Sequence, residues 1–256
     1  MNHPASPQKI DLFDIAIDNV TMAEAISRID QLVLERRNAY VVTPNVDHVV
    51  KLQNDALFKK IYDNAALVVA DGMPLVWASR LLGKPLKERV TGADLLPRVC
   101  ALSAQKGYAV FLLGANKGVA AQAAHLLRQT YPGLNICGTY SPSYGFEKNE
   151  AENAVILAML ASARPDILFV GVGAPKQEKW IYHYRGQYTI PVALGVGASF
   201  DFIAGTVQRA PAWMQTLGFE WFYRFLMEPR RLFKRYFIDG ARYFGLTLGE
   251  WRKSRR

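Results

Sequence analysis

The fold is decided by residues 168–180, which read LFVGVGAPKQEKW. A continuous apolar run leads directly into a glycine turn, which is typical of a strand buried on both faces. Dinucleotide-binding proteins carry a G-x-G-x-x-G pattern at such a turn. Here Lys176 stands at the third glycine position and Pro175 precedes it. The stretch therefore predicts a strand and a tight turn, and it disfavours a dinucleotide cradle.

Apolar strands alternate with helical segments on both sides of this stretch. A hydroxyl at Thr21 and a carboxylate at Glu24 form a capping-box pattern that starts the first helix. Strands are predicted at 40–43, 67–71, 108–114, 134–139, 166–172 and 190–196, and helices at 21–36, 46–64 (with a break near Asp55), 74–82, from 91, 117–130, 149–163 and 176–185. This order predicts an α/β fold with a mostly parallel, Rossmann-like sheet flanked by helices.

Composition limits the class of protein. The chain has 256 residues, half of them hydrophobic, which is enough for one sizeable core and an appendage. Its two cysteines form no metal or disulfide pattern, which favours a reducing cytoplasm. Neither a signal peptide nor an apolar run of about 20 residues is evident, so we expect a soluble or peripheral protein.

The C-terminal segment differs from the rest of the chain. Residues 209–256 carry eleven lysines and arginines against four acids, a net charge of +7 out of the +9 of the whole chain. Twelve of these 48 residues are aromatic. The pattern fits a membrane-surface element, a packed helix with a basic face, or a single-stranded nucleic-acid binder. We expect a domain over 1–205 and a helical, basic and aromatic appendage over 206–256.

Ligands of parallel sheets bind beyond the carboxyl ends of the strands, where several candidate residues lie. Asp71 ends one predicted strand and is either a general base or the cap of the next helix. Arg89 and Gln177 lie on loops expected at the same edge. The sequence contains no G-x-S-x-G, P-loop, H-E-x-x-H or strand-end D-x-D pattern, so no metal ligands and no cofactor are expected.

Taken together, these loops resemble the WecG/TagA/CpsF glycosyltransferase family. The stretches that carry the resemblance are TPNVDHVV (43–50), VVADGMPLVW (68–77), ERVTGADLL (88–96), FLLGA (111–115), LFVGVGAPKQEKW (168–180), GVGASFDFIAG (195–205) and RAPAWMQTLGFEWFYRFLMEPRRLFKRY (209–236). The resemblance implies an inverting enzyme that moves N-acetylmannosamine, its uronic acid or glucose. The donor would be a UDP-sugar and the acceptor a polyprenyl-diphosphate-linked saccharide, in the synthesis of bacterial surface polysaccharide.

The resemblance also implies roles for individual residues. Asp71 would be the base, and Thr43, Arg89 and Gln177 would support it in catalysis. Substrate would be bound by Asn45, Gly72, Gly114, Gly171, Gly173, Lys176, Gly197, Asp201, Arg209, Arg224, Arg230 and Arg231. The appendage would hold the protein on the inner face of the cytoplasmic membrane. The alternatives are a nucleotide-cofactor oxidoreductase and a basic nucleic-acid-binding module; the oligomeric state is not indicated.

Overall fold

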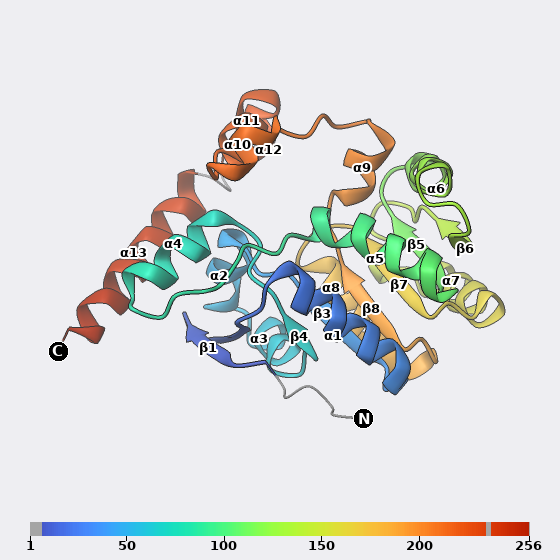
Figure 1. Ribbon diagram of the computed structural model, residues 1–256, viewed down its shortest axis with the longest axis horizontal. Coiled ribbons are helices and arrows are strands. Elements are labelled where there is room, and N and C mark those ends of the chain that lie inside the picture. The colour runs from blue at the N-terminus through green and yellow to red at the C-terminus, as the bar shows by residue number, and fades with distance from the viewer. Residues whose placement is uncertain (1–6, 234–236, 256) are drawn as a thin grey trace. The chain divides into compact units, whose positions relative to one another are not determined.

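Strands and helices alternate along most of the chain in the computed structural model, which describes residues 7–233 and 237–255 (Figure 1). These residues divide into two units. Unit 1 comprises the described residues of 1–25, 43–91 and 209–256, and unit 2 comprises Ile26–Val42 and Gly92–Gln208. The predicted division into a domain over 1–205 and an appendage over 206–256 stays a prediction.

Unit 2 is built around a parallel sheet. Its strands are hydrogen-bonded in the order β3 (Ala39–Val42), β8 (Val192–Gly195), β7 (Ile167–Gly171), β5 (Ala109–Gly114) and β6 (Asn135–Tyr140). Each neighbouring pair is parallel, and Ile167 lies between Val110 of β5 and Val192 of β8. Every residue of β7 and β8 is buried, as expected for strands covered on both faces. The predicted α/β fold with a parallel sheet is confirmed.

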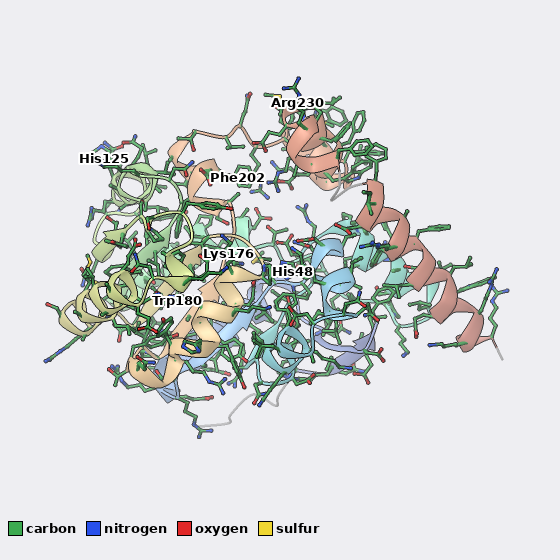
Figure 2. The ribbon with its side chains drawn as sticks, turned by 180° about the vertical axis from the view of Figure 1, so that it is seen from behind. His48, His125, Lys176, Trp180, Phe202 and Arg230 are labelled. Carbon is green, nitrogen blue, oxygen red and sulfur yellow. The ribbon has the colours of Figure 1, made fainter. Side chains whose placement is uncertain are left out.

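Helices cover both faces of this sheet (Figures 1 and 2). On one face, α1 (Met22–Glu35) and α5 (Gly92–Lys106) are joined where Lys106 contacts Asp30. On the other face, Trp180 of α8 (Lys176–Tyr184) donates to Asn153 of α7 (Glu150–Ala163). The remaining helices of the unit are α6 (Val119–Thr130), α9 (Ser199–Ala204) and the short 3-10 helices η1 (Phe146–Lys148) and η2 (Arg185–Gln187).

Unit 1 combines a small hairpin with helices from both ends of the chain. Its elements are β1 (Lys9–Leu12), β2 (Ile15–Asp18), α2 (Val46–Leu52), α3 (Ala56–Asp63), β4 (Leu67–Val68), α4 (Met73–Leu81), α10 (Ala212–Thr216), α11 (Glu220–Met227), α12 (Pro229–Phe233) and α13 (Asp239–Ser254). The C-terminal helix α13 packs against α2, and its buried Tyr243 contacts the Phe13 ring. The Tyr243 hydroxyl also donates to the carbonyl of Pro74, 3.0 Å away.

Local sequence signals account for the starts of two helices. Thr21 and Glu24 form the predicted capping box, and Asp55 caps α3 through the Phe58 N–H, which confirms the break in the 46–64 segment. Strand β4 is shorter than predicted because the backbone beyond it turns to loop partners: the Asp71 N–H donates to Pro44, and Ala70 accepts from Val90. Helix α9 was not predicted. Among the described residues, none of the helices has the length and apolar character needed to span a bilayer.

Candidate functional site

The predicted site residues fall into two groups, one in each unit. In unit 1, Thr43 is buried and directly follows β3. Asn45 caps α2, because its side-chain oxygen accepts from the N–H groups of Asp47 and His48 at 3.1 and 3.3 Å. The Asp71 N–H donates to the carbonyl of Pro44 at 2.8 Å. This backbone bond holds the loop of Thr43 and Asn45 beside the loop of Asp71.

The position of Asp71 bears on the two roles considered for it. Helix α4 begins at Met73, and its N-cap residue is Gly72, whose φ of 124° suits glycine. Asp71 is therefore not the N-cap residue. The half-buried carboxylate lies one residue before the cap, at the end of a buried apolar segment. Aspartate is common at helix starts because its side chain caps the helix from the N-cap position. Since Asp71 does not occupy that position, a capping role explains it less well than the sequence suggested.

Arg89 belongs to a cluster of charged side chains in the same unit. Its Nη1 donates to Oε2 of Glu220 at 3.3 Å, and Nε of Arg209 donates to Oε1 of the same carboxylate at 3.2 Å. The three side chains are between 17% and 22% exposed. Glu220 thus joins two predicted site residues that lie 120 positions apart in the sequence.

The other predicted arginines lie on α11 and α12. Arg224 is half-buried and lies one helical turn after Glu220, on the same side of α11. Arg230 is exposed in the first turn of α12 (Figure 2). Arg231 follows it in α12, but its side chain lies outside the described part of the structure. In unit 1, the structure thus brings together Arg89 and Arg209, with Arg224 on the same helix as their shared partner.

In unit 2, the predicted glycines lie at the carboxyl ends of adjacent strands. A Cβ on Gly114, at the end of β5, would lie 2.5 Å from the carbonyl oxygen of Gly171. A Cβ on Gly171, at the end of β7, would lie 2.8 Å from the carbonyl oxygen of Gly197. Close contact between backbones therefore requires both glycines. By contrast, Gly173 and Gly197 face open space in the Cβ direction, which leaves room for a ligand at the same edge.

Gln177 links α8 to the loop after β8. Its Oε1 accepts from the Gly197 N–H at 3.0 Å, and its Nε2 donates to Oε1 of Glu178 at 2.7 Å. The side chains of Gln177 and Glu178 are buried, with residue exposures of 2% and 0%. Gly195 makes room for them, because a Cβ there would lie 2.8 Å from Nε2 of Gln177. Gln177 thus fixes the glycine loop 195–197 in place, and its predicted contact with substrate stays a prediction.

Lys176 begins α8, as Figure 2 shows, and pairs with Glu147 at 3.2 Å. Its Nζ also lies 4.6 Å from the ring centre of Tyr144, a loop residue that is 99% exposed. The last predicted residue, Asp201, lies on α9, and its carboxylate and carbonyl both accept from the Thr206 hydroxyl. Lys176 therefore lies at the strand-end edge, whereas Asp201 helps to close the turn after α9.

The loop after β6 is fastened to the same edge of the sheet. The Ser141 hydroxyl lies 3.1 Å from the carbonyl oxygens of both Gly114 and Asn116. Further along the loop, the hydroxyl and the N–H of Ser143 donate to the Glu152 carboxylate. These hydrogen bonds hold the pKa of Glu152 below its ordinary value of 4.5. The loop is thus anchored at Ser141 and Ser143, which both precede Tyr144 in the sequence.

Metal ligation was not expected from the sequence. Within residues 7–233 and 237–255, histidine, cysteine, aspartate and glutamate do not gather in any group of three or more that could hold a metal ion. Among the predicted site residues, Arg89 and Arg209 pair with Glu220, and Lys176 pairs with Glu147.

Two residues of these clusters were not predicted from the sequence. Glu220 is one of four acids among eleven basic residues in the C-terminal segment, and nothing in its neighbours marks it. Glu178 follows Gln177 and reads as an ordinary exposed helix residue, although it is fully buried. The available signal for Glu178 was helical spacing, since it lies three residues before the buried Ile181 on α8.

Comparison with known proteins gives concordant matches. A family model described as Glycosyl transferase WecG/TagA/CpsF family matches residues 10–256. The N-acetylglucosaminyldiphosphoundecaprenol N-acetyl-beta-D-mannosaminyltransferase of Staphylococcus aureus (strain MW2) is 31% identical over 226 residues, which cover 88% of this chain and 87% of the relative. A protein of the same name from Bacillus spizizenii is 34% identical over 197 residues, which cover 77% and 74%. The resemblance seen in the sequence is confirmed.

Proposed function

Because the chain belongs to the WecG/TagA/CpsF family of glycosyltransferases, we propose that it transfers N-acetylmannosamine from a UDP-sugar to N-acetylglucosaminyl-diphosphoundecaprenol. The names of the two relatives support this choice of sugar and acceptor. They favour it over the uronic acid and glucose that the family resemblance also allows. The observation that carries the proposal is the match over residues 10–256, which includes every predicted site residue.

The proposed reaction needs a base and a means of stabilising the leaving group. Asp71 takes the proton from the acceptor hydroxyl, whose oxygen attacks the anomeric carbon of the donor. The bond from that carbon to the diphosphate breaks, and UDP leaves with the bonding electrons. Displacement from the opposite face inverts the anomeric configuration. The half-buried position of Asp71, outside the N-cap of α4, supports its role as the base.

Negative charge develops on the UDP diphosphate as its bond to the sugar breaks. Arginine suits this charge because its planar guanidinium matches phosphate oxygens. Arg89 and Arg209 share one carboxylate within unit 1, and Arg224 follows on α11. We assign these three arginines to the diphosphates of the substrates. Within unit 2, we assign the backbone N–H groups of the glycine loops to binding of a sugar nucleotide.

We further propose that the C-terminal segment binds the inner face of the cytoplasmic membrane, where a polyprenyl-linked acceptor is embedded. Leu226 and Met227 at the end of α11 are 60% and 58% exposed. Further large apolar side chains of this segment are exposed, namely Trp213, Leu217, Phe219, Trp221, Phe222, Phe233, Phe237, Ile238 and Phe244. Apolar side chains interspersed with arginines are suited to an interface with anionic lipid.

The membrane proposal is tested by sedimentation with vesicles of phosphatidylglycerol and phosphatidylcholine. Replacing Leu226 and Met227 by serine should weaken binding, whereas Val155→Ser in unit 2, which is 51% exposed, should leave it unchanged. Raising the salt concentration screens the arginines far more than the apolar contacts, so a part of the binding should persist. Equal sedimentation of the wild type and the double variant would refute the role of α11.

The enzymatic proposal is tested by incubating the full chain with UDP-N-acetylmannosamine and a short-chain prenyl-diphosphate-linked N-acetylglucosamine. We expect a disaccharide product and released UDP. Asp71→Asn should lower kcat by about 10²- to 10⁴-fold, the usual contribution of a general base. Asp63→Asn, at an exposed carboxylate that ends α3, is the matched control and should keep full turnover. Wild-type turnover in the Asp71→Asn variant would remove Asp71 from the mechanism.

A donor panel separates this function from the alternatives. UDP-glucose and the uronic acid donor should be used far less well than UDP-N-acetylmannosamine. If no UDP-sugar is turned over, titration with NAD(P)H and filter binding of single-stranded RNA over a salt series test the oxidoreductase and nucleic-acid alternatives directly.

A further inference from the structure

The carboxylate of Glu220 lies between two arginines from distant parts of the chain. Arg89 follows α4 in the sequence, whereas Arg209 lies eleven residues before Glu220. The N–O distances are 3.3 and 3.2 Å. The side chains of Arg89 and Glu220 are both 17% exposed and that of Arg209 is 22% exposed. Screening by water is therefore weaker here than for ion pairs on the open surface.

The fold holds Glu220 in place through the turn that precedes it. Glu220 is the first residue of α11, and Gly218 lies two residues earlier in a left-handed conformation, with φ of 81°. Gly218 is buried against α4, because a Cβ there would lie 2.7 Å from Cβ of Met73 and 2.8 Å from Cζ2 of Trp77. The start of α11 is thus packed on the helix that follows Asp71. The backbone that bears the Glu220 carboxylate is therefore held in place, and the side chains of Arg89 and Arg209 extend to that carboxylate.

The charges of Arg89, Arg209 and Glu220 indicate what the Glu220 carboxylate does. Two guanidinium groups repel each other, and each long side chain loses rotamer freedom when it is held in one place. One carboxylate between them offsets the repulsion and fixes both orientations. Two positive charges and one negative charge leave a net charge of +1 on Arg89, Arg209 and Glu220 together. Arginines that are held in advance of binding lose less freedom when an anion binds to them.

We infer that Glu220 is a positioning residue that holds Arg89 and Arg209 together as a two-guanidinium site for a substrate diphosphate. This inference rests on the proposed function, since both the UDP-sugar and the lipid-linked acceptor carry a diphosphate. Glu220 does not touch the substrate in this arrangement. It sets the orientation of the two side chains that do, and it does so from the α11 turn rather than from the loop that bears Arg89.

The sign of one measured change tests the inference. Glu220→Gln removes a negative charge beside an anion site, so charge alone would make UDP bind more tightly. Positioning predicts the opposite: UDP affinity, measured by calorimetry on the full chain, should fall about tenfold, the equivalent of about 1.4 kcal/mol. Glu220→Asp keeps the charge on a shorter side chain and should lie between the wild type and Glu220→Gln. The control is Glu250→Gln, which removes a carboxylate paired with Lys253 on α13 and should leave UDP affinity unchanged.

Steady-state kinetics identify which diphosphate uses the site. A rise in KM for the UDP-sugar assigns it to the donor, and a rise in KM for short-chain prenyl-diphosphate-linked N-acetylglucosamine assigns it to the acceptor. If UDP itself does not respond in calorimetry, the acceptor analogue is titrated in its place. In either case circular dichroism should show that Glu220→Gln is folded at the temperature of the titration, so that the change in affinity is measured on folded protein.

Three results would overturn the inference. Unchanged or tighter binding of both diphosphates to Glu220→Gln would show that the carboxylate does not position the arginines. Equal losses in Glu220→Gln and Glu250→Gln would show an effect that is not specific to the cluster of Arg89 and Arg209, and weaker binding explained wholly by unfolding would show a structural role. The proposed function is tested separately by the wild type: if it binds a diphosphate through Glu220 but transfers no sugar, the function fails and the positioning role stands.

Discussion

Substituting Gly218 by alanine should destabilise the protein by more than its backbone conformation alone explains. Its φ of 81° lies in the left-handed region, which costs a residue with a Cβ about 1–2 kcal/mol. The new methyl group would also lie 2.7 Å from Met73 Cβ and 2.8 Å from Trp77 Cζ2. Met73 Cβ is fixed by the backbone of α4, so the overlap adds about 1–3 kcal/mol of overpacking. The expected total is about 2–5 kcal/mol.

Two other glycines of unit 1 separate these contributions. Gly83 has a φ of 72° but faces open space, so Gly83→Ala measures the conformational cost alone. Gly245 lies inside α13, is exposed and also faces open space. Gly245→Ala should therefore stabilise the protein by about 0.5–1 kcal/mol, the usual advantage of alanine in a helix. The three substitutions add the same methyl group, and the structure predicts three different results.

Urea unfolding, followed by far-ultraviolet circular dichroism and tryptophan fluorescence, measures the three free energies of unfolding. The expected order of stability is Gly245→Ala above the wild type, then Gly83→Ala, then Gly218→Ala. A loss in Gly218→Ala no larger than that in Gly83→Ala would refute the close contact with Met73 and Trp77. The turn before α11 would then lack the rigid support on which the placement of Glu220 depends.

Three further outcomes are expected from other contacts. Tyr243→Phe removes the hydrogen bond to the Pro74 carbonyl and should cost about 1 kcal/mol in urea unfolding. Gln177→Ala leaves the Gly197 N–H without its side-chain acceptor and should lower the free energy of unfolding by about 2 kcal/mol or more. An unchanged free energy of unfolding would contradict the role of Gln177 in fixing the glycine loop 195–197. The pKa of Glu152 is lowered in the folded state, so its carboxylate contributes stability above pH 4.5, and this contribution is lost as the pH falls through the folded-state pKa. The difference in unfolding free energy between the wild type and Glu152→Gln should therefore shrink below pH 4.5, and a difference that is independent of pH between 3 and 7 would contradict it.

The elements that sequence reasoning predicted well are those with strong local signals. The continuous apolar runs of β5, β7 and β8 predict strands buried on both faces, and the capping box before α1 fixes where that helix begins. Strand β4 and helix α9 were predicted less well because tertiary contacts set their extents. Beyond β4, the Asp71 N–H bonds to the loop at Pro44 and the Ala70 carbonyl bonds to the loop at Val90, and α9 packs against α6.

The glycines show how a correct pattern can have more than one physical cause. The family resemblance implied that Gly114, Gly171, Gly173 and Gly197 all bind substrate. The structure divides them: Gly114 and Gly171 are required because adjacent backbones approach one another, whereas Gly173 and Gly197 face open space. In the sequence, both kinds of glycine follow an apolar run and cannot be told apart. Sequence alone could locate this edge of the sheet, but it could not say which glycines serve the sheet and which could serve a ligand.

Glu220 shows the complementary limit. Its charge is opposite to that of its surroundings in the sequence, so composition describes residues 209–256 as simply basic. What gives Glu220 a role is the meeting of three segments: the loop of Arg89, the start of the C-terminal segment at Arg209, and the turn at Gly218. A pairing over 131 positions leaves no periodic signal in one chain. An acidic residue within a basic segment is therefore a candidate for organising its arginines, and the sign of the affinity change in Glu220→Gln is the measurement that decides it.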